Sequence, residues 1–287
     1  MTDRAPGDTP HIDSVLQEKR LFAPAPEFSA RSRVPSREAY DALCKQARND
    51  PQGFWREQAL SLDWFMPFQT VLDESNPPFY KWFTEGRLNL AHNCLDRHLD
   101  LHGEKRALVW EGEPGDTRTL TYRQLHAEVC RAANALQALG VAPGDRVAIY
   151  LPMIPEAVIA MLACARVGAT HSVIFGGFAQ EAIRDRVNDS GCSLIITADG
   201  GWRRGKIVPL KLNVDHALEH GCPTVKHVLL VTRTGENVNF VEGRDVRWDD
   251  VVPQQPATHS AVAVDAEHPL FILYTSGTTG KPKGVVH

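Results

Sequence analysis

From about residue 107 onward, short apolar runs alternate with segments in which apolar residues recur at helical spacing. Runs of this length with β-branched residues are typical of buried strands. The predicted strands are 107–110, 146–151, 171–175, 194–198 and 228–231. Short buried strands that alternate with amphipathic helices predict an α/β fold, with helices covering a largely parallel sheet.

The helices between these strands carry start and stop signals. Thr121 and Gln124 have the spacing of a capping box, and Gly140 follows the end of that helix. The residues expected on its buried face are Leu125, Val129, Ala132, Ala133 and Leu136. A second helix is predicted from Pro155 to about Gly168, and a third over about 179–188. Another is suggested by Ile207, Leu210 and Leu212, although Pro209 interrupts it.

The first hundred residues have a different character. Residues 1–35 are rich in proline and charge and show no hydrophobic period, which predicts a flexible arm. Helices are predicted after Ser36 and after Asp50, both as N-caps. Residues 36–96 form a mostly helical, aromatic-rich segment. We therefore expect an arm, this N-terminal segment, and an α/β domain over 97–287.

Composition excludes several function classes. The net charge of −4 over 287 residues argues against nucleic-acid binding. The longest apolar stretch, Ala157 to Ala165, is about half of the roughly 20 residues that span a membrane, and the polar N-terminus is not a secretion signal. The six cysteines form no CxxC pair, which favours free thiols and a cytoplasmic location.

The strongest chemical signal lies near the end of the chain. Residues 269–274 predict a buried strand, and 285–287 begin another. The loop between them supplies glycine amides, hydroxyls and lysine charge, the groups that bind a triphosphate. The candidate phosphate-binding residues are Thr275, Ser276, Gly277, Thr278, Thr279, Gly280, Lys281, Lys283 and Gly284.

This loop is not the common P-loop. That motif needs glycine where Thr275 stands and Ser or Thr where Pro282 stands. Proline also disfavours helical geometry at Lys281, so we expect the loop to join strand to strand. The alternative is an ordinary glycine-serine hairpin turn, which the density of lysines and hydroxyls disfavours.

A second candidate site is a basic cluster. Arg203, Arg204, Gly205 and Lys206 follow one another, with Lys211 nearby. Guanidinium forks and lysine charge suit phosphate recognition. The alternative is a solvated surface loop, because short basic runs are often only surface.

A metal site is not expected. His98 and His102 are four residues apart, with His92 and Cys94 nearby. No second cysteine pair or acidic ligand completes the set, so local packing or capping is the preferred interpretation.

The sequence resembles known families at several points. Tyr-Thr-Ser-Gly-Thr-Thr-Gly-Lys-Pro-Lys-Gly at 274–284 resembles the signature loop of the adenylate-forming superfamily. The stretches at 82–98, 148–156, 161–168 and 171–178 resemble those of acetyl-CoA synthetases. The resemblance runs from about Tyr40 to His287.

The resemblance implies a function and assigns sites. The loop at 275–284 would cover the β- and γ-phosphates of ATP, with Mg²⁺ bridging phosphates through ligands outside this chain. Arg203, Arg204, Gly205 and Lys206 would bind the phosphorylated ribose of coenzyme A, which Gly177 would approach through its backbone. Lys206 stands where the family often has arginine. Acetate, ATP and coenzyme A would give acetyl-CoA, AMP and pyrophosphate.

Other functions fit parts of the same sequence pattern. Propionyl-CoA synthetases and amino-acid-activating domains share parts of the pattern, and a non-catalytic nucleotide- or CoA-binding module is the alternative of another class. No residue is assigned as acid, base or nucleophile, because family members continue well beyond this chain. The chain alone is therefore expected to be inactive, and no oligomeric state is assigned.

Overall fold

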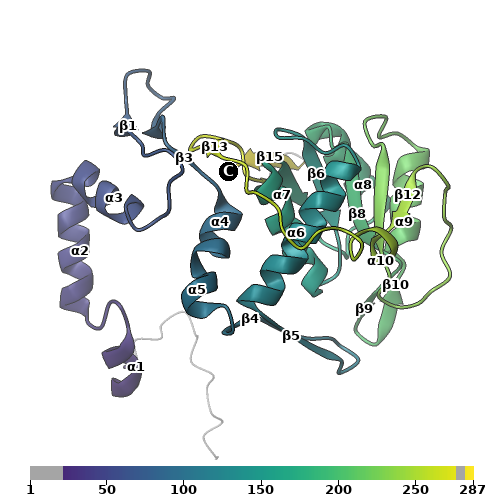
Figure 1. The fold of residues 1–287 in the computed structure, drawn as a ribbon, viewed down its shortest axis with the longest axis horizontal. Coiled ribbons are helices and arrows are strands. Elements are labelled where there is room, and N and C mark those ends of the chain that lie inside the picture. The colour runs from purple at the N-terminus through teal and green to yellow at the C-terminus, as the bar shows by residue number, and fades with distance from the viewer. Residues whose placement is uncertain (1–21, 276–281) are drawn as a thin grey trace, which may run out of the picture. The chain divides into compact units, whose positions relative to one another are not determined.

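The computed structural model describes residues 22–275 and 282–287 and divides the chain into two units, Met1–Trp55 and Arg56–His287. Figure 1 shows the order of the elements along the chain. The expected flexible arm lies partly in residues 1–21, outside the described part. Within the rest of it, the short helix α1 (Pro26–Arg31) buries no residue.

Two helices start where the capping residues predict. Helix α2 (Arg37–Asn49) begins after Ser36, whose hydroxyl accepts a hydrogen bond from the Ala39 amide at 3.2 Å. Helix α3 (Pro51–Ala59) begins after Asp50, whose carboxylate accepts from the Gly53 amide at 2.9 Å. Both predictions are confirmed, because each cap satisfies an amide that the helix itself leaves unpaired.

A five-stranded parallel sheet forms the centre of the second unit. Its strands are β6 (Arg146–Tyr150), β7 (Thr170–Val173), β8 (Leu194–Ala198), β11 (His227–Val231) and β12 (Asp245–Arg247). Their spatial order is β12-β11-β8-β6-β7, and all four pairings are parallel. The predicted α/β class is confirmed. The middle strands β6, β8 and β11 are almost wholly buried, as their continuous apolar runs require.

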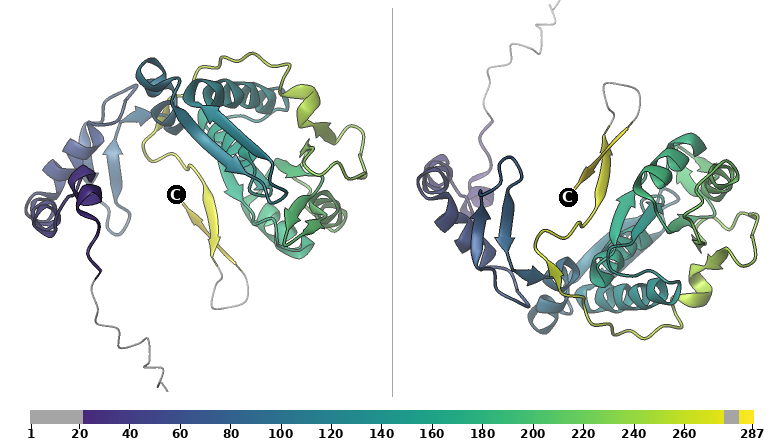
Figure 2. Two further views of the ribbon diagram at one scale, coloured as in Figure 1. Left: turned by 90° about the horizontal axis from the view of Figure 1, so that it is seen from below. Right: turned by 90° about the horizontal axis from the view of Figure 1, so that it is seen from above.

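Helices cover both faces of the sheet (Figure 2). Helix α6 (Tyr122–Ala138) packs with α7 (Pro155–Val167), and α8 (Gln180–Ser190) packs with α9 (Leu210–Glu219). The crossover β6-α7-β7 runs in one direction along the sheet and β7-α8-β8 in the other, so right-handed connections place α7 and α8 on opposite faces. None of the described helices combines the length and apolar character needed to cross a membrane.

The helix signals of the sequence are largely confirmed. Thr121 and Gln124 form a full capping box at the start of α6, and Gly168 ends α7 in the left-handed conformation, with φ of 76°. One expectation is wrong: Ile207 belongs to a strand, not to the helix suggested with Leu210. Pro209 occupies the N-cap position of α9, so the helix starts at Leu210.

The remaining short elements lie outside the five-stranded sheet. Antiparallel pairs are formed by β1 (Thr70–Asp73) with β2 (Lys81–Thr84), β3 (Arg87–Leu88) with β13 (Val264–Asp265), and β4 (Arg106–Glu111) with β5 (Thr117–Thr121). The short helices are α4 (Leu90–Cys94), η2 (Asp96–His98), α5 (Leu99–His102) and α10 (Trp248–Val251).

The last two strands form a hairpin of their own. Strand β14 (Ile272–Thr275) pairs antiparallel with β15 (Lys283–Val286), which confirms that the loop between them joins strand to strand. The expectation of a buried strand is wrong. Leu273 is 49% exposed, because in the described part of the chain β14 pairs only with β15. A single bridge between His171 and Phe271 ties its start to β7.

Candidate functional site

A cavity of about 490 Å³ opens at the carboxyl ends of β6, β7 and β8. Its floor includes Leu151 after β6, Ile174 after β7 and Gly201 after β8. Strand β6 lies between β7 and β8, although both follow it in sequence, so the chain's path along the sheet reverses there. Connections on opposite faces leave a crevice at such a reversal, where open α/β sheets bind their ligands.

The wall of the cavity is mostly apolar and aromatic. Trp110, Met153, Phe175, Trp202 and Leu273 line it. The indole Nε1 of Trp110 donates to the Met153 carbonyl at 2.6 Å, which fixes that ring against the segment after β6. A largely apolar pocket with a few fixed polar groups is the usual form of a small-molecule site.

The basic cluster forms a tight hairpin at the cavity's edge. Strands β9 (Gly201–Arg203) and β10 (Lys206–Val208) are joined by two residues, both left-handed: φ is 52° at Arg204 and 72° at Gly205. Two left-handed residues suit a two-residue hairpin turn. The carboxylate of Glu113, at the tip of the β4–β5 hairpin, accepts hydrogen bonds from the amides of Arg204 (3.0 Å) and Gly205.

The structure brings Arg203 and Gly177 together. The guanidinium carbon of Arg203 lies 4.9 Å from the centroid of the Phe175 ring. A Cβ placed on Gly177 would lie 2.1 Å from Arg203 Nη1, so only glycine leaves room for this guanidinium. Lys206 faces Arg203 across the hairpin register. Arg203 lines the cavity, and Lys206 comes from the adjacent strand.

Lys211, which the sequence groups with this cluster, lies elsewhere. Its side chain is fully buried, and its ammonium donates to Asp215 at 2.7 and 2.8 Å and pairs with Asp245 at 2.8 Å. Helix α9 turns the residue inward. The grouping of Lys211 with the phosphate-binding residues is therefore wrong.

Sequence reasoning missed two groups that follow strands β8 and β11. Arg233 hydrogen-bonds the Asp116 carboxylate at 2.7 and 3.0 Å, and its guanidinium carbon lies 5.0 Å from the Trp110 ring centroid. Asp199, which is buried, accepts hydrogen bonds from four backbone amides. The donors are Gly200, Arg233, Thr234 and Gly235, at 2.7 to 3.1 Å. Neither group has a local sequence pattern, because their partners come from distant segments.

The candidate phosphate loop begins and ends in the β14–β15 hairpin. Thr275 pairs with Lys283, and Tyr274 pairs with Gly284. Six predicted residues lie outside the described part of the chain: Ser276, Gly277, Thr278, Thr279, Gly280 and Lys281. The hydroxyl of Tyr274 donates to Asp189 at 2.6 Å. Burial and this carboxylate raise the pKa of Tyr274, so its hydroxyl keeps its proton.

Residues 95–287 match the model of a family described as AMP-binding enzyme. The chain belongs to the AMP-binding enzyme family. Residues 40–94 match a second family model, described as Acetyl-coenzyme A synthetase N-terminus.

Several proteins are similar to this chain over most of its length. Acetyl-coenzyme A synthetase of Streptomyces avermitilis is 56% identical over 277 residues, and that of Cupriavidus pinatubonensis is 53% identical over 279. Each match covers 96% of this chain and 42% of the relative. The solved structure of acetoacetyl-CoA synthetase from Streptomyces lividans superposes with a TM-score of 0.80, at 30% identity, over 91% of this chain and 40% of that one. The chain thus spans less than half the length of these relatives.

The histidines near residue 100 do not surround a common point. His92 pairs with Asp63 at 3.2 Å, and the rings of His98 and His102 lie 6.1 Å apart. Within residues 22–275 and 282–287, no group of three or more His, Cys, Asp or Glu residues is placed to hold a metal ion. The capping role in this segment falls to Asn89, whose side chain accepts from the Ala91 amide at 2.9 Å.

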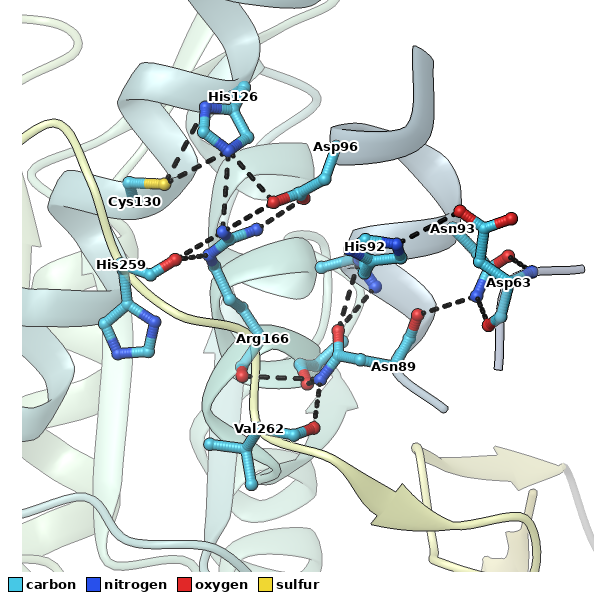
Figure 3. Close-up of polar contacts among 12 residues, drawn as sticks. Asp63, Asn89, His92, Asn93, Asp96, His126, Cys130, Arg166, His259 and Val262 are labelled. Atoms are coloured by element: carbon cyan, nitrogen blue, oxygen red, sulfur yellow. Dashed lines mark hydrogen bonds and ion pairs between the residues drawn. The ribbon is translucent and has the colours of Figure 1, made fainter. Parts of the chain in front are cut away.

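A polar network beside α7 joins segments that are far apart in the sequence (Figure 3). Arg166 is 2% exposed and holds the Asp96 carboxylate through two hydrogen bonds of 2.7 and 2.9 Å. It also donates to the His259 carbonyl. His126 contacts the same carboxylate at 3.2 Å and Cys130 Sγ at 3.6 Å. Burial opposes ionisation of Asp96, but hydrogen bonds from Arg166 and His126 outweigh it and hold its pKa well below the usual range.

Proposed function

We propose that the complete enzyme activates acetate with ATP to acetyl-adenylate and then transfers the acetyl group to coenzyme A. The products are acetyl-CoA, AMP and pyrophosphate. The observation that carries the proposal is the cavity at the strand reversal, edged by the hairpin of Arg203 and Lys206 and by the Gly177 turn. The likeness to two acetyl-CoA synthetases over 96% of the chain supports acetate as the acid.

The chemistry explains why both nucleotides are needed. A carboxylate does not release oxide, so its oxygen must first be joined to a good leaving group. Attack on the α-phosphorus of ATP forms the acyl-adenylate and expels pyrophosphate. The thiol of coenzyme A then attacks the acyl carbon, and AMP leaves. For both steps the protein mainly positions the reactants and offsets their charge.

We assign the first step to the loop between β14 and β15. Thr275, Ser276, Gly277, Thr278, Thr279, Gly280, Lys281, Lys283 and Gly284 are its proposed ATP-binding residues. The pairing of Thr275 with Lys283 supports this assignment, because it sets a hydroxyl and an ammonium side by side where the loop begins and ends.

We assign the second step to the cavity and its basic hairpin. Arg203 and Lys206 would bind phosphate of coenzyme A, with Arg204 and Gly205 forming the turn between them and Gly177 leaving room for the ligand. The amides of the turn already donate hydrogen bonds to the carboxylate of Glu113. Recognition of phosphate would therefore rest on the side chains of Arg203 and Lys206.

Mg²⁺ would accompany ATP as the cation of its phosphates. The described residues do not form an acidic cluster that fits the ion. We also propose the domain boundary near residues 96 and 97, which the change of family model between residues 94 and 95 supports. The cytoplasmic location stays a prediction.

The full-length enzyme tests the assignment of the two steps. Arg203→Met should raise the KM for coenzyme A about tenfold, because a charge-assisted hydrogen bond contributes about 1.5–3 kcal/mol, and should leave acetate-dependent pyrophosphate exchange unchanged. Lys283→Ala should slow that exchange. Arg184→Met, on the outer side of α8, is the matched control.

The outcomes separate the alternatives. Loss of exchange in Arg203→Met would remove that residue from the coenzyme A site. Faster turnover with propionate or an amino acid than with acetate would change the substrate. Binding of coenzyme A without AMP formation from any carboxylate would instead favour a non-catalytic binding module.

A further inference from the structure

One buried arginine lies between the two proposed binding regions. Arg186 projects from α8, is 7% exposed, and donates from Nη1 to the Ala182 carbonyl at 2.8 Å. Among the described residues it makes no ion pair with a carboxylate. Burial lowers its pKa. A buried cation that is not paired needs another source of stabilisation.

That stabilisation comes from two aromatic rings. The guanidinium carbon lies 4.7 Å from the centroid of Phe178 and 5.3 Å from that of Tyr274. Both distances are within the range of favourable cation–π contacts. A guanidinium is planar and weakly hydrated, so it can contact two rings at once, which the rounded and strongly hydrated ammonium of lysine does less well.

The two rings belong to the two proposed binding regions. Phe178 directly follows Gly177 in the turn after β7, and the hydroxyl of Tyr150 holds the Phe178 carbonyl at 2.7 Å. Tyr274 lies in β14, one residue before Thr275, where the candidate phosphate loop begins. The Arg186 side chain therefore contacts Phe178, beside Gly177 of the proposed coenzyme A site, and Tyr274, at the base of the candidate phosphate loop.

Helix α8 also holds Tyr274 through its hydroxyl. The hydroxyl donates to Asp189 Oδ2 at 2.6 Å and lies 3.3 Å from the Arg186 carbonyl. The helix itself is anchored in the core by Ile183 and Val187, both fully buried. Besides its pairing with β15, strand β14 contacts β7, and a bridge joins Phe271 to His171 just before it. The hydrogen bonds of Tyr274 with α8 hold the other end of β14, next to the loop.

We propose that Arg186 is a positioning residue that holds the base of the phosphate loop against the Gly177–Phe178 turn. This rests on the proposed function, because it concerns the same two sites. Removing the guanidinium should loosen both segments at once. Removing only the Tyr274 hydroxyl should loosen β14 alone, because the ring of Phe178 keeps its contact with Arg186.

Hydrogen exchange of the 287-residue chain without ligand tests the contact itself. In Arg186→Met, which keeps the volume of the stem, amides at 175–179 and 272–275 should exchange about fivefold faster, as expected for loss of one cation–π contact at each segment. Arg186→Lys should behave similarly, because it keeps the charge but loses the planar group. Tyr274→Phe should accelerate exchange at 272–275 only.

Arg184→Met is the control, because Arg184 lies on the same helix and pairs with its neighbour Asp185. It should leave both segments unchanged. Unchanged exchange at either segment in Arg186→Met would overturn the proposal. So would an equal acceleration throughout the sheet, because that would show a general loss of stability and not the release of two segments.

Kinetics of the full-length enzyme provide the second readout. Arg186→Met should raise the KM for both ATP and coenzyme A about fivefold, whereas Tyr274→Phe should raise only that for ATP. An effect on kcat alone would count against a positioning role. The two proposals can fail independently. An inactive wild-type enzyme would refute the proposed function, whereas the hydrogen-exchange experiment needs no ligand and tests only the contacts of Arg186.

Discussion

Raising the pH above 9 should remove a positive charge from the network beside α7. His126 is 3.2 Å from Asp96 and 3.6 Å from Cys130 Sγ, and its side chain is 16% exposed. The hydrogen bond to Asp96 and the contact with Cys130 outweigh burial and raise the pKa of His126 to about 9. The ordinary value is 6.5. Folding therefore increases the affinity of this imidazole for its proton.

The sign and size of the effect follow from that difference. A group whose pKa is raised by folding stabilises the native state fully below its unfolded pKa, here 6.5. That contribution is lost as the pH rises through the folded value of about 9. The interval corresponds to about 3 kcal/mol. Because Asp96 also binds Arg166, its carboxylate stays paired when His126 becomes neutral, so the network weakens without breaking.

Urea unfolding of the wild type and of His126→Gln, at pH 6 and pH 10, measures this contribution. The advantage of the wild type in unfolding free energy should shrink by about 3 kcal/mol between the two pH values. The difference between the two proteins cancels most other titrations, and His102→Gln, at an exposed histidine, is the control. An advantage that does not change with pH, or an imidazole that titrates near 6.5 by NMR, would refute this account.

Two further substitutions test other parts of the structure. Lys211→Met should lower the unfolding free energy by about 1.5–3 kcal/mol, because it removes a charge-assisted donor from Asp215 and Asp245 and leaves Arg244 as the cation that the two carboxylates share; a loss below about 1 kcal/mol in urea unfolding would contradict this. Gly177→Ala should push Arg203 off the Phe175 ring, since the new Cβ would lie 2.1 Å from its guanidinium. The new Cβ would also lie 2.7 Å from Phe175 Cε1. Stability should change little, because the end of Arg203 and the exposed ring of Phe175 can both move, yet the KM for coenzyme A should rise about fivefold; an unchanged KM would place the ligand elsewhere.

Most of the fold could be predicted because it is encoded locally. The apolar runs of β6, β8 and β11 are continuous because each strand is covered on both faces. Caps such as Ser36 and Thr121 satisfy amides only three residues away. The exception is β14, whose apolar residues resemble a buried strand. Burial there depends on which strands lie beside it, and a local pattern does not contain that information.

The site was harder to predict, because its charged side chains meet partners that are far apart in the sequence. Asp116 meets Arg233 across 117 residues, and Glu113 meets Arg204 across 91. Lys211 was grouped with Arg203 because the two are close in sequence, but α9 directs the lysine to the interior. Asp215, four residues later, was the available signal: the spacing allows a pair on one helix face.

Asp199 has a consequence for the choice of ligand. Amides that converge at the carboxyl end of a parallel sheet would attract any phosphate that entered the crevice, and here four of them already surround a carboxylate of the protein itself. In the folded chain the Asp199 carboxylate occupies the place between these four amides, so another anion cannot bind there. In the proposed function, phosphate of the ligand would therefore bind the arginine and lysine of the hairpin and not these four amides.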